Sequence, residues 1–448
     1  DAARIHISQK TNVDLNFGIG TAESMQIKSI AKSAITVKAD NVRLVGRESL
    51  VLVTNTDAFN SQGGQIQAWS GIYLMANNDE ADFDFLTKAP MLADIWRQPR
   101  VLIDVTERID EIKYFFNSFL SLKKTGKLYI FGSGDGLFAS RIVATREASF
   151  VAVSGLEMLA NVSTRLKPDD IALAVSMSGN VDRTVEAAEA VVKNGNLCGA
   201  VVNGEGGRLG TLNLPLFSID IHDIAPFLCG TSSYIATLEI LQLFSAIKSG
   251  IIDEAINAIQ NTAIKLKNLL PELNKVCKEI AENIAENITG VRILSLGEEG
   301  LATADYGAAK LVELTSIRPY TDDIEEFAHC QFWSADPNDF IIYIPNSILV
   351  SEVASRSAKA LSEMGFSSLF LGPDCFSVTS TNWSIKFGDL NNSQDIYFLA
   401  TVTLQLLAYH LAMTVGLDPN KRQHLINDKL RFRVSRKLTR RHLLSNSN

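Results

Sequence analysis

The sequence predicts an α/β protein with two doubly wound parallel sheets joined by helices, preceded by a small β-rich segment. From residue 126 on, continuously apolar strands alternate with glycine turns and helices, which is typical of parallel sheets covered on both faces. The alternation stops at residues 251–287, which contain almost no Gly or Pro and are expected to be helical, and restarts at residue 291. Residues 1–84 carry short β-branched stretches broken by Asn, Asp and Gly, which favours strands and turns.

The changes of pattern divide the chain into five expected parts. A chain of 448 residues is too long for one ordinary domain, and two to three compact units are expected. The parts are a β-rich segment at residues 1–86, leading helices and a first α/β domain at 87–260, a helical connector at 261–290, a second α/β domain at 291–420 and a basic tail at 421–448. For this tail, a solvated helical extension is favoured over an anion-binding arm.

Composition excludes several classes of function. The net charge of -8 argues against a protein that coats nucleic acid or an acidic membrane. No apolar run reaches the roughly 18 uncharged residues of a membrane span, and no signal peptide opens the sequence, so a cytoplasmic protein is expected. The five cysteines lie far apart without a CxxC pair, which predicts neither a zinc site nor a disulfide framework.

Two turns rich in Ser and Gly follow predicted strands of the first α/β domain. Residues 128–131 run into the turn at 132–136, and residues 171–175 run into the turn at 176–179. In a parallel sheet, ligands collect at the carboxyl ends of the strands, where helix N-termini attract anions and serine hydroxyls add donors. One such turn alone often only caps a helix, but two predict a phosphate site. Its candidate residues are Ser133, Gly134, Ser176, Ser178 and Gly179.

A carboxylate and a histidine in the second domain are candidates for proton transfer. Glu313 lies three residues after Lys310, and His329 ends the stretch at 325–329. Moving a sugar carbonyl between neighbouring carbons requires a base such as a carboxylate, and ring opening suits a histidine near neutral pH. Each residue taken alone is more often structural. The histidines are not spaced as metal ligands, so no metal and no cofactor is expected.

Two helical stretches carry a resemblance to a known family. Residues 91–99, MLADIWRQP, and residues 404–412, LQLLAYHLA, are similar to the first and last helices in the isomerase half of glucosamine-6-phosphate synthases. The resemblance covers residues 87–420. It implies two flavodoxin-like sugar isomerase (SIS) domains, a small phosphorylated sugar as ligand and an obligate homodimer.

The same resemblance implies roles for individual residues. Ser133, Ser176 and Ser178 fall where the family binds the sugar phosphate, and Thr231 lies in its following ligand loop. Glu313 falls at the family's proton-shuttling carboxylate. His329 falls at its ring-opening histidine, which in the family reaches into the neighbouring subunit's site.

The sequence departs from the family at two positions. The family's catalytic lysine aligns on Asn427, and Lys429 is the nearest substitute. A phosphate-binding threonine aligns on Val181, with Thr184 nearby. A glutaminase domain is absent, so glutamine-derived ammonia is not expected. Residues 325–332, EEFAHCQF, look more like stand-alone members that act on aminated or glycated sugar phosphates.

Three functional hypotheses therefore stay open. The first is an aldose–ketose isomerase or deaminase that acts on an amino-sugar phosphate. The second is a non-catalytic sugar-phosphate sensor, which the loss of the lysine and the threonine favours. The third is a virion component, because residues 1–86, which include RIHISQKTNVDLNFGIG and GIYLMANND, look like a structural protein segment of T4-type tailed phages.

Overall fold

The computed structural model describes residues 3–8, 34–39, 89–120, 126–221, 224–225, 228–376, 378–390, 395–421 and 428–439. The chain divides into two compact units, Asp1–Pro90 and Met91–Asn448. In the first unit, β1 (Ala3–Ser8) and β2 (Ala34–Ala39) pair antiparallel, with Ile5 opposite Val37. The remainder of the phage-like segment lies outside the described residues.

The second unit contains two parallel five-stranded sheets of the same strand order. The first sheet has the order β4-β3-β5-β6-β7 and the second has β12-β11-β10-β8-β9. Numbered within each sheet, both orders are 2-1-3-4-5, the flavodoxin-like doubly wound arrangement. The predicted fold class is therefore confirmed. The strands are β3 (Leu128–Gly132), β4 (Phe150–Ser154), β5 (Ile171–Val175), β6 (Leu197–Val202), β7 (Leu216–Ser218), β8 (Gly290–Ser295), β9 (Arg318–Asp323), β10 (Asp339–Ile344), β11 (Ser367–Gly372) and β12 (Trp383–Lys386).

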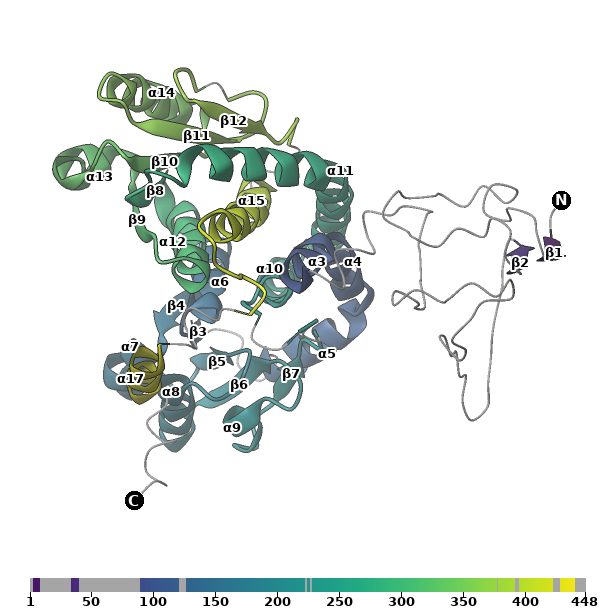
Figure 1. Ribbon diagram of the computed structural model, residues 1–448. Helices are drawn as coiled ribbons and strands as arrows, with labels where there is room; N and C mark the ends of the chain where they lie inside the picture. Colours follow the sequence, from purple (N-terminus) through teal and green to yellow (C-terminus); the bar gives the residue numbers. More distant parts are fainter. Residues whose placement is uncertain are drawn as a thin grey trace. The chain divides into compact units, whose positions relative to one another are not determined.

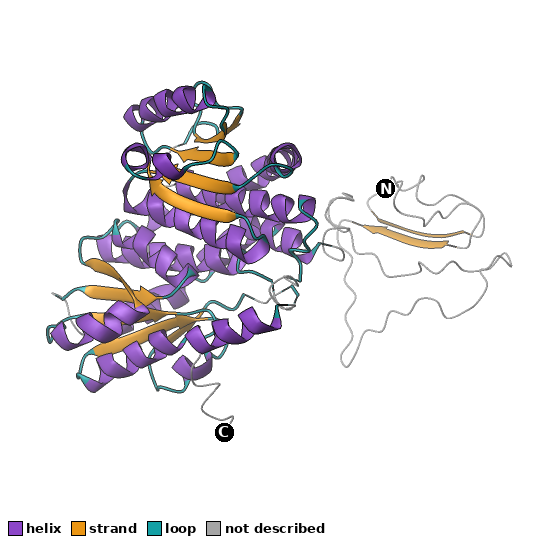
Figure 2. Cartoon of the chain, turned by 60° about the vertical axis from the view of Figure 1, so that its left-hand side comes forward, coloured by secondary structure: helices purple, strands orange, loops and turns teal. Residues whose placement is uncertain are grey.

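We call residues 128–218 the first lobe and residues 290–386 the second lobe. Helices lie between the two sheets and on their outer faces (Figures 1 and 2). The helices are α3 (Pro90–Trp96), α4 (Gln98–Glu107), α5 (Ile109–Leu120), α6 (Asp135–Ala144), α7 (Gly155–Glu157), η1 (Met158–Val162), η2 (Ser163–Arg165), α8 (Asp182–Lys193), α9 (Gly207–Gly210), α10 (Ser232–Ser249), α11 (Ile252–Ile284), α12 (Gly297–Leu314), α13 (Ile324–His329), η3 (Gln331–Ser334), α14 (Ile348–Ser362), α15 (Asp395–Thr414) and α17 (Lys429–Thr439).

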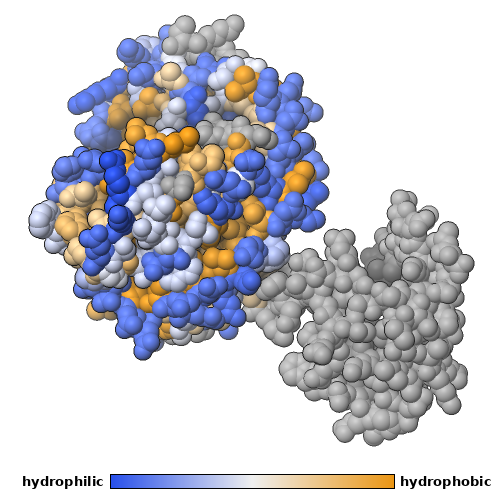
Figure 3. Space-filling model, turned by 90° about the horizontal axis from the view of Figure 1, so that it is seen from above, coloured by the Kyte–Doolittle hydropathy of each residue, from blue (hydrophilic) through white to orange (hydrophobic). Residues whose placement is uncertain are grey.

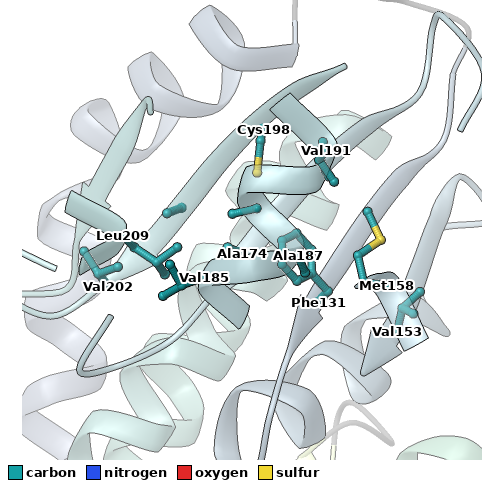
Figure 4. Packing of buried hydrophobic residues seen from close by; sticks show 13 residues of the cluster. Phe131, Val153, Met158, Ala174, Val185, Ala187, Val191, Cys198, Val202 and Leu209 are labelled. Atoms are coloured by element: carbon teal, nitrogen blue, oxygen red, sulfur yellow. The ribbon is translucent and has the colours of Figure 1, made fainter. Parts of the chain in front are cut away.

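The core of the first lobe joins its central strands to α8. Phe131 of β3 and Ala174 of β5 pack with Val185 and Ala187 of α8, and all four are almost completely buried (Figure 4). Small alanines on the helix let it approach the sheet closely, while each buried valine or phenylalanine contributes roughly 1.5–3 kcal/mol. A second core of the same kind packs Tyr343 and its neighbours against α13 and α14.

Two long helices, α11 and α15, pack against each other, and α11 joins the two lobes in the chain. The 33-residue α11 is continuous through Pro271, so the expected boundary at residue 260 falls inside one helix. The helix α15 is long and apolar enough to cross a membrane, but 94% of its most apolar window is buried inside the protein. Burial on all sides explains its apolar composition, and α15 is a core helix of the second unit.

Candidate functional site

The first Ser- and Gly-rich turn connects β3 to α6. Gly134 has a φ of 56° and stands at the N-cap of α6, so the turn needs a residue that tolerates the left-handed region. A Cβ on Gly136 would lie 2.6 Å from the Val175 carbonyl oxygen, because the turn packs against the end of β5. Ser133 and Gly134 are exposed. The N-terminus of α6 therefore opens to solvent at the carboxyl end of the sheet.

The second turn follows β5 and is held by a neighbouring loop. Gly179 has a φ of 61°, and a Cβ there would overlap the carbonyl oxygen of Gly206. The Asn203 N–H donates to the Met177 carbonyl at 3.0 Å. Ser176 is buried and Ser178 is exposed, with its Oγ accepting from the Asn180 N–H at 3.3 Å.

These two turns lie at neighbouring strand ends. Gly132 is the register partner of Val175, so the residues that follow them leave the sheet at the same end, where the strands finish. The structure thus brings Ser133 and the pair Ser176 and Ser178 to one end of the first sheet. The N-termini of α6 and α8 also point to this end, which favours an anion.

The two candidate threonines are placed differently from these serines. Thr184, at the third position of α8, is fully buried, and its hydroxyl finds no hydrogen-bond partner among the described residues. Thr231 is also fully buried, and its hydroxyl donates to Asp94 of α3. Asp94 also accepts from the Ser232 N–H at 2.9 Å and pairs with Arg97 at 2.5 Å. The Thr231 hydroxyl therefore anchors the start of α10 against α3.

A buried lysine links the second lobe to the first turn. Lys310 of α12 has no exposed surface, and its Nζ lies 3.2 Å from Asp135 Oδ2 and 3.3 Å from Glu313 Oε2. Burial alone would lower the pKa of Lys310, but the carboxylates of Asp135 and Glu313 outweigh burial and raise it. Lys310 is therefore charged at neutral pH. Glu313 stays one-third exposed at this end of the first sheet.

A tyrosine pair packs beside this lysine. Tyr306 stacks on Tyr234 with 3.7 Å between ring centroids, and Lys310 Nζ lies 4.9 Å from the Tyr306 centroid. The Tyr306 hydroxyl donates to the Gly230 carbonyl at 2.9 Å and accepts from Gln405 Nε2 at 2.8 Å. The pair fixes α12 against α10, so the distance from Lys310 to the first turn is set by rigid helices.

Sequence reasoning missed Asp135 and Tyr306 as parts of this arrangement. Asp135 lies within the glycine turn at 132–136, so the sequence already places a carboxylate beside the predicted phosphate site. Tyr306 precedes Lys310 by four residues and so shares its helix face. Its contact with Tyr234 joins segments 72 residues apart, and no local pattern predicts such a contact.

His329 lies far from Glu313 within one chain. It ends α13 beyond the carboxyl end of β9, its ring is 63% exposed, and its Nε2 lies 3.4 Å from Glu325 Oε1. Glu313 ends α12, which returns antiparallel to β8 toward the opposite end of the second sheet (Figure 1). The two candidate proton-transfer residues of one chain therefore lie at opposite ends of the second sheet.

The C-terminal helix lies near the end of α12. Lys429 is the exposed first residue of α17, whereas Asn427 lies outside the described residues. Arg431 of the same helix lines a pocket of about 480 Å³ together with Val312 and residues 315–320. The basic helix thus borders the turn that follows Glu313. Within the described ranges, His, Cys, Asp and Glu side chains form no group of three that could hold a metal ion.

The repeated sheet order makes the chain a tandem α/β protein with a flavodoxin-like strand order in each lobe. No protein-family model matches the chain. The chain is homologous to the isomerase (SIS) domain of glutamine–fructose-6-phosphate aminotransferase, with 26% identity to the Thermotoga maritima protein over 283 residues. The match covers 58% of this chain and 44% of that protein, so the chain spans less than half the length of its relative.

Solved structures show the same fold. Tagatose-6-phosphate ketose/aldose isomerase from Escherichia coli matches with a TM-score of 0.62 and 19% identity, over 75% of this chain and 95% of that one. Glucosamine-6-phosphate deaminase from Thermotoga maritima matches with a TM-score of 0.53 and 18% identity, over 72% and 96%. Both likenesses cover nearly the whole of the solved chains, so the fold extends over both lobes.

Proposed function

We propose that the chain is an aldose–ketose isomerase or deaminase that acts on an amino-sugar phosphate. The observation that carries the proposal is the bridge from Asp135 through Lys310 to Glu313, which brings a second-lobe carboxylate to the serine turns of the first lobe. A phosphate at the turns and a base beside the sugar carbons are the two requirements of this chemistry. The relatives named above act on phosphorylated sugars or amino sugars, which supports this class of substrate.

The phosphate is proposed to bind at the N-termini of α6 and α8. Backbone N–H groups and the helix dipoles favour a dianion there, and the hydroxyls of Ser133, Ser176 and Ser178 supply further donors. Each hydrogen bond to a charged group contributes about 1.5–3 kcal/mol. Asp135 would oppose a phosphate, but its pairing with Lys310 compensates its charge.

Glu313 is proposed to carry the proton between the two sugar carbons. The carboxylate takes a proton from the carbon next to the carbonyl, and the carbonyl oxygen gains a proton, so that an enediol forms. The carboxylate then returns its proton to the former carbonyl carbon, while the hydroxyl on the other carbon loses its proton and becomes the new carbonyl. Its partial exposure leaves it open to a ligand, while Lys310 holds it in place. Lys310 is thus a positioning residue for the base.

The acid–base group for ring opening is proposed to come from a second copy of the chain. His329 is exposed and lies away from Glu313 of its own chain, as expected if it serves a neighbouring site. Patches of hydrophobic surface lie among hydrophilic residues on the face of the second unit seen in Figure 3. Large exposed apolar residues include Trp333, Ile348 and Leu349. A homodimer would cover such residues and complete the site.

Subunit complementation tests this shared site. Glu313→Gln and His329→Asn are each expected to be inactive as pure homodimers. When they are mixed, unfolded and refolded in equal amounts, half of the dimers carry both changes and one intact site, so about a quarter of the wild-type turnover returns. Mixtures that stay inactive, with dimers present by light scattering, would contradict the exchange of His329 between subunits.

The reaction itself is tested by a substrate panel. Phosphorylated hexoses, hexosamines and fructosamines are screened by thermal shift, because a tight ligand stabilises the folded chain by mass action. Stabilising compounds are then followed by NMR for isomerised or deaminated product. We expect product with at least one amino-sugar phosphate in the wild type, and product formation at least about a hundredfold slower in Glu313→Gln. Unchanged turnover in Glu313→Gln would rule out the assigned base.

A second candidate function is non-catalytic sensing of a sugar phosphate. Val181 in place of a phosphate-binding threonine favours it, and so does Asn427 in place of a lysine. Calorimetric binding of a phosphosugar without any product by NMR would identify this function. In that case Glu313→Gln is expected to change affinity alone.

A further inference from the structure

A cavity of about 210 Å³ lies at the end of α10 away from the serine turns. It is bounded by α4, α10, α11 and α15, which lie side by side (Figure 1). Its polar lining includes Glu239, Gln242, Arg146 and Asp395. Tyr234, at the start of α10, belongs to the candidate active site, whereas Glu239 lies more than a helical turn further on. The cavity is therefore separate from the proposed site.

Glu239 is a buried carboxyl group without a matching partner. Its side chain has no exposed surface, and neither of its oxygen atoms has a hydrogen-bond partner among the described residues. Gln242 lies three residues after Glu239 on α10, and its Nε2 also has no hydrogen-bond partner among the described residues. An unsatisfied buried polar group costs about 1–3 kcal/mol, and more when charged. A bound water molecule or ion is one of the ways in which proteins satisfy such groups.

The charges around the cavity favour a cation. Three acids line it, namely Glu239, Asp395 and Glu254, against one base, Arg146. Arg146 already pairs through its Nε with Glu299 at 2.9 Å, which compensates part of its charge. Burial, with a smaller contribution from Asp395 and against the opposing effect of Arg146, raises the pKa of Glu239 to about 8. Burial also raises the pKa of Asp395. A bound cation would stabilise the ionised form of both carboxyl groups.

The lining selects among cations. Calcium and magnesium require six or more oxygen ligands. The three acids only line the cavity, and among the described residues no three His, Cys, Asp or Glu side chains are grouped so that they could hold a metal ion. A primary ammonium group instead carries three N–H donors and needs only a few acceptors, which the two oxygens of Glu239 provide. Leu102, Ile259 and Phe398 add apolar surface for a short alkyl group. We propose that this cavity binds ammonium or a small primary amine, with Glu239 as its principal acceptor.

Thermal unfolding of the full chain tests the proposal. Methylammonium chloride is titrated at pH 8 against sodium, potassium and tetramethylammonium chloride at equal ionic strength. Methylammonium is expected to raise the Tm saturably by at least about 2 °C, and tetramethylammonium, which has no N–H, is expected to have no such effect. Equal shifts with all four salts, or none with methylammonium, would overturn the proposal.

Matched variants locate the effect. Glu239→Gln keeps the shape but removes the charge, and is expected to abolish the methylammonium shift. Glu254→Gln makes the same change at an exposed residue of the cavity rim and is expected to keep it. A shift that persists in Glu239→Gln would contradict the site. If Glu239→Gln does not fold, Asp395→Asn takes its place and is expected to weaken the shift at least threefold in apparent affinity; an unchanged shift there would contradict it as well.

The proposal does not depend on the proposed function. Glu313→Gln leaves this cavity intact and is expected to show the full methylammonium shift. Loss of turnover in Glu313→Gln together with a retained shift would separate the two sites. A shift that disappears in Glu313→Gln would instead place amine binding at the candidate active site and overturn the cavity assignment.

Discussion

The two lobes share one strand order but differ in the turns at their strand ends. In the first lobe, residues 132–136 and 176–179 are rich in Ser and Gly, and the first of these turns leaves the N-terminus of α6 exposed. In the second lobe, β8 is followed by Gly297, Glu298 and Glu299 at the start of α12. Glu298 pairs with Arg141 of α6, and Glu299 pairs with Arg146 at 2.9 Å. The corresponding turn of the second lobe therefore joins the lobes instead of offering an anion site.

This difference shows that a repeated fold does not repeat its chemistry. The strand order is the same in both lobes, whereas the residues of the turns at the strand ends differ. The second lobe contributes from its other end, where α12 finishes with Lys310 and Glu313. The proposed site thus combines the turns of one lobe with the helix end of the other.

Glu313→Gln gives the largest expected effect. Loss of the base is expected to lower turnover of the responsive amino-sugar phosphate by about 10²–10⁴-fold, with affinity changed little. Steady-state kinetics measures this split between kcat and KM. The control is Glu298→Gln in the second-lobe turn, which breaks a pair with Arg141 and is expected to keep turnover within a few-fold. Equal losses in both variants would show that lobe contact, not the base, controls activity.

Lys310→Met is expected to destabilise the folded chain by about 2–4 kcal/mol. Removing a buried charge leaves Asp135 and Glu313 facing each other, although their partial exposure reduces the penalty. Urea unfolding measures the difference, and exposed Lys278→Met is the control. The pKa of Lys310 is raised in the folded state. The contribution of Lys310 to the free energy of unfolding is therefore fully present below about pH 10 and is lost as the pH rises through the folded-state pKa. The difference should therefore stay constant between pH 6 and 9; a decline in that range would contradict a charged Lys310.

Gly179→Ala and Gly297→Ala compare turn geometry in the two lobes. Both glycines have positive φ, but a Cβ on Gly179 would overlap the Gly206 carbonyl oxygen, whereas one on Gly297 meets nothing within 4 Å. Gly179→Ala is expected to lower the free energy of unfolding by more than about 2 kcal/mol, and Gly297→Ala by about 1 kcal/mol. Urea unfolding of both variants checks the order. The opposite order would mean that the loop at 203–207 does not constrain the phosphate turn.

Ser178→Ala gives the smallest expected effect. Loss of one hydroxyl donor to phosphate is expected to weaken phosphosugar binding about tenfold, as measured by calorimetry. The control, Ser347→Ala, removes the hydroxyl that caps α14 in the second lobe, where Oγ accepts from the Val350 N–H at 3.3 Å. It is expected to lower stability by about 1 kcal/mol without changing affinity. Weaker binding in Ser347→Ala alone would move the phosphate to the second lobe.

The sequence predicted the two sheets because their strands are local apolar runs that end in turn residues. Residues 128–131 run into a glycine turn, and residues 341–344 end at Pro345 and Asn346. It also predicted the turn residues Ser133, Ser176 and Ser178 at one sheet edge, since strand order follows from the doubly wound pattern. It could not predict that Thr231 bonds to Asp94 or that Lys310 reaches Asp135, because these contacts join residues 137 and 175 positions apart. These contacts form only when whole helices pack against each other, and local sequence patterns do not show that packing.

The most direct measurement is a crystal structure of the chain with the best-stabilising sugar phosphate from the panel. The phosphate is expected within hydrogen-bonding distance of the Ser176 and Ser178 hydroxyls, with the Glu313 carboxylate facing the first two carbons of the sugar. A phosphate bound at the second-lobe turn near Glu298, or a sugar whose reactive carbons point away from Glu313, would contradict the proposed site.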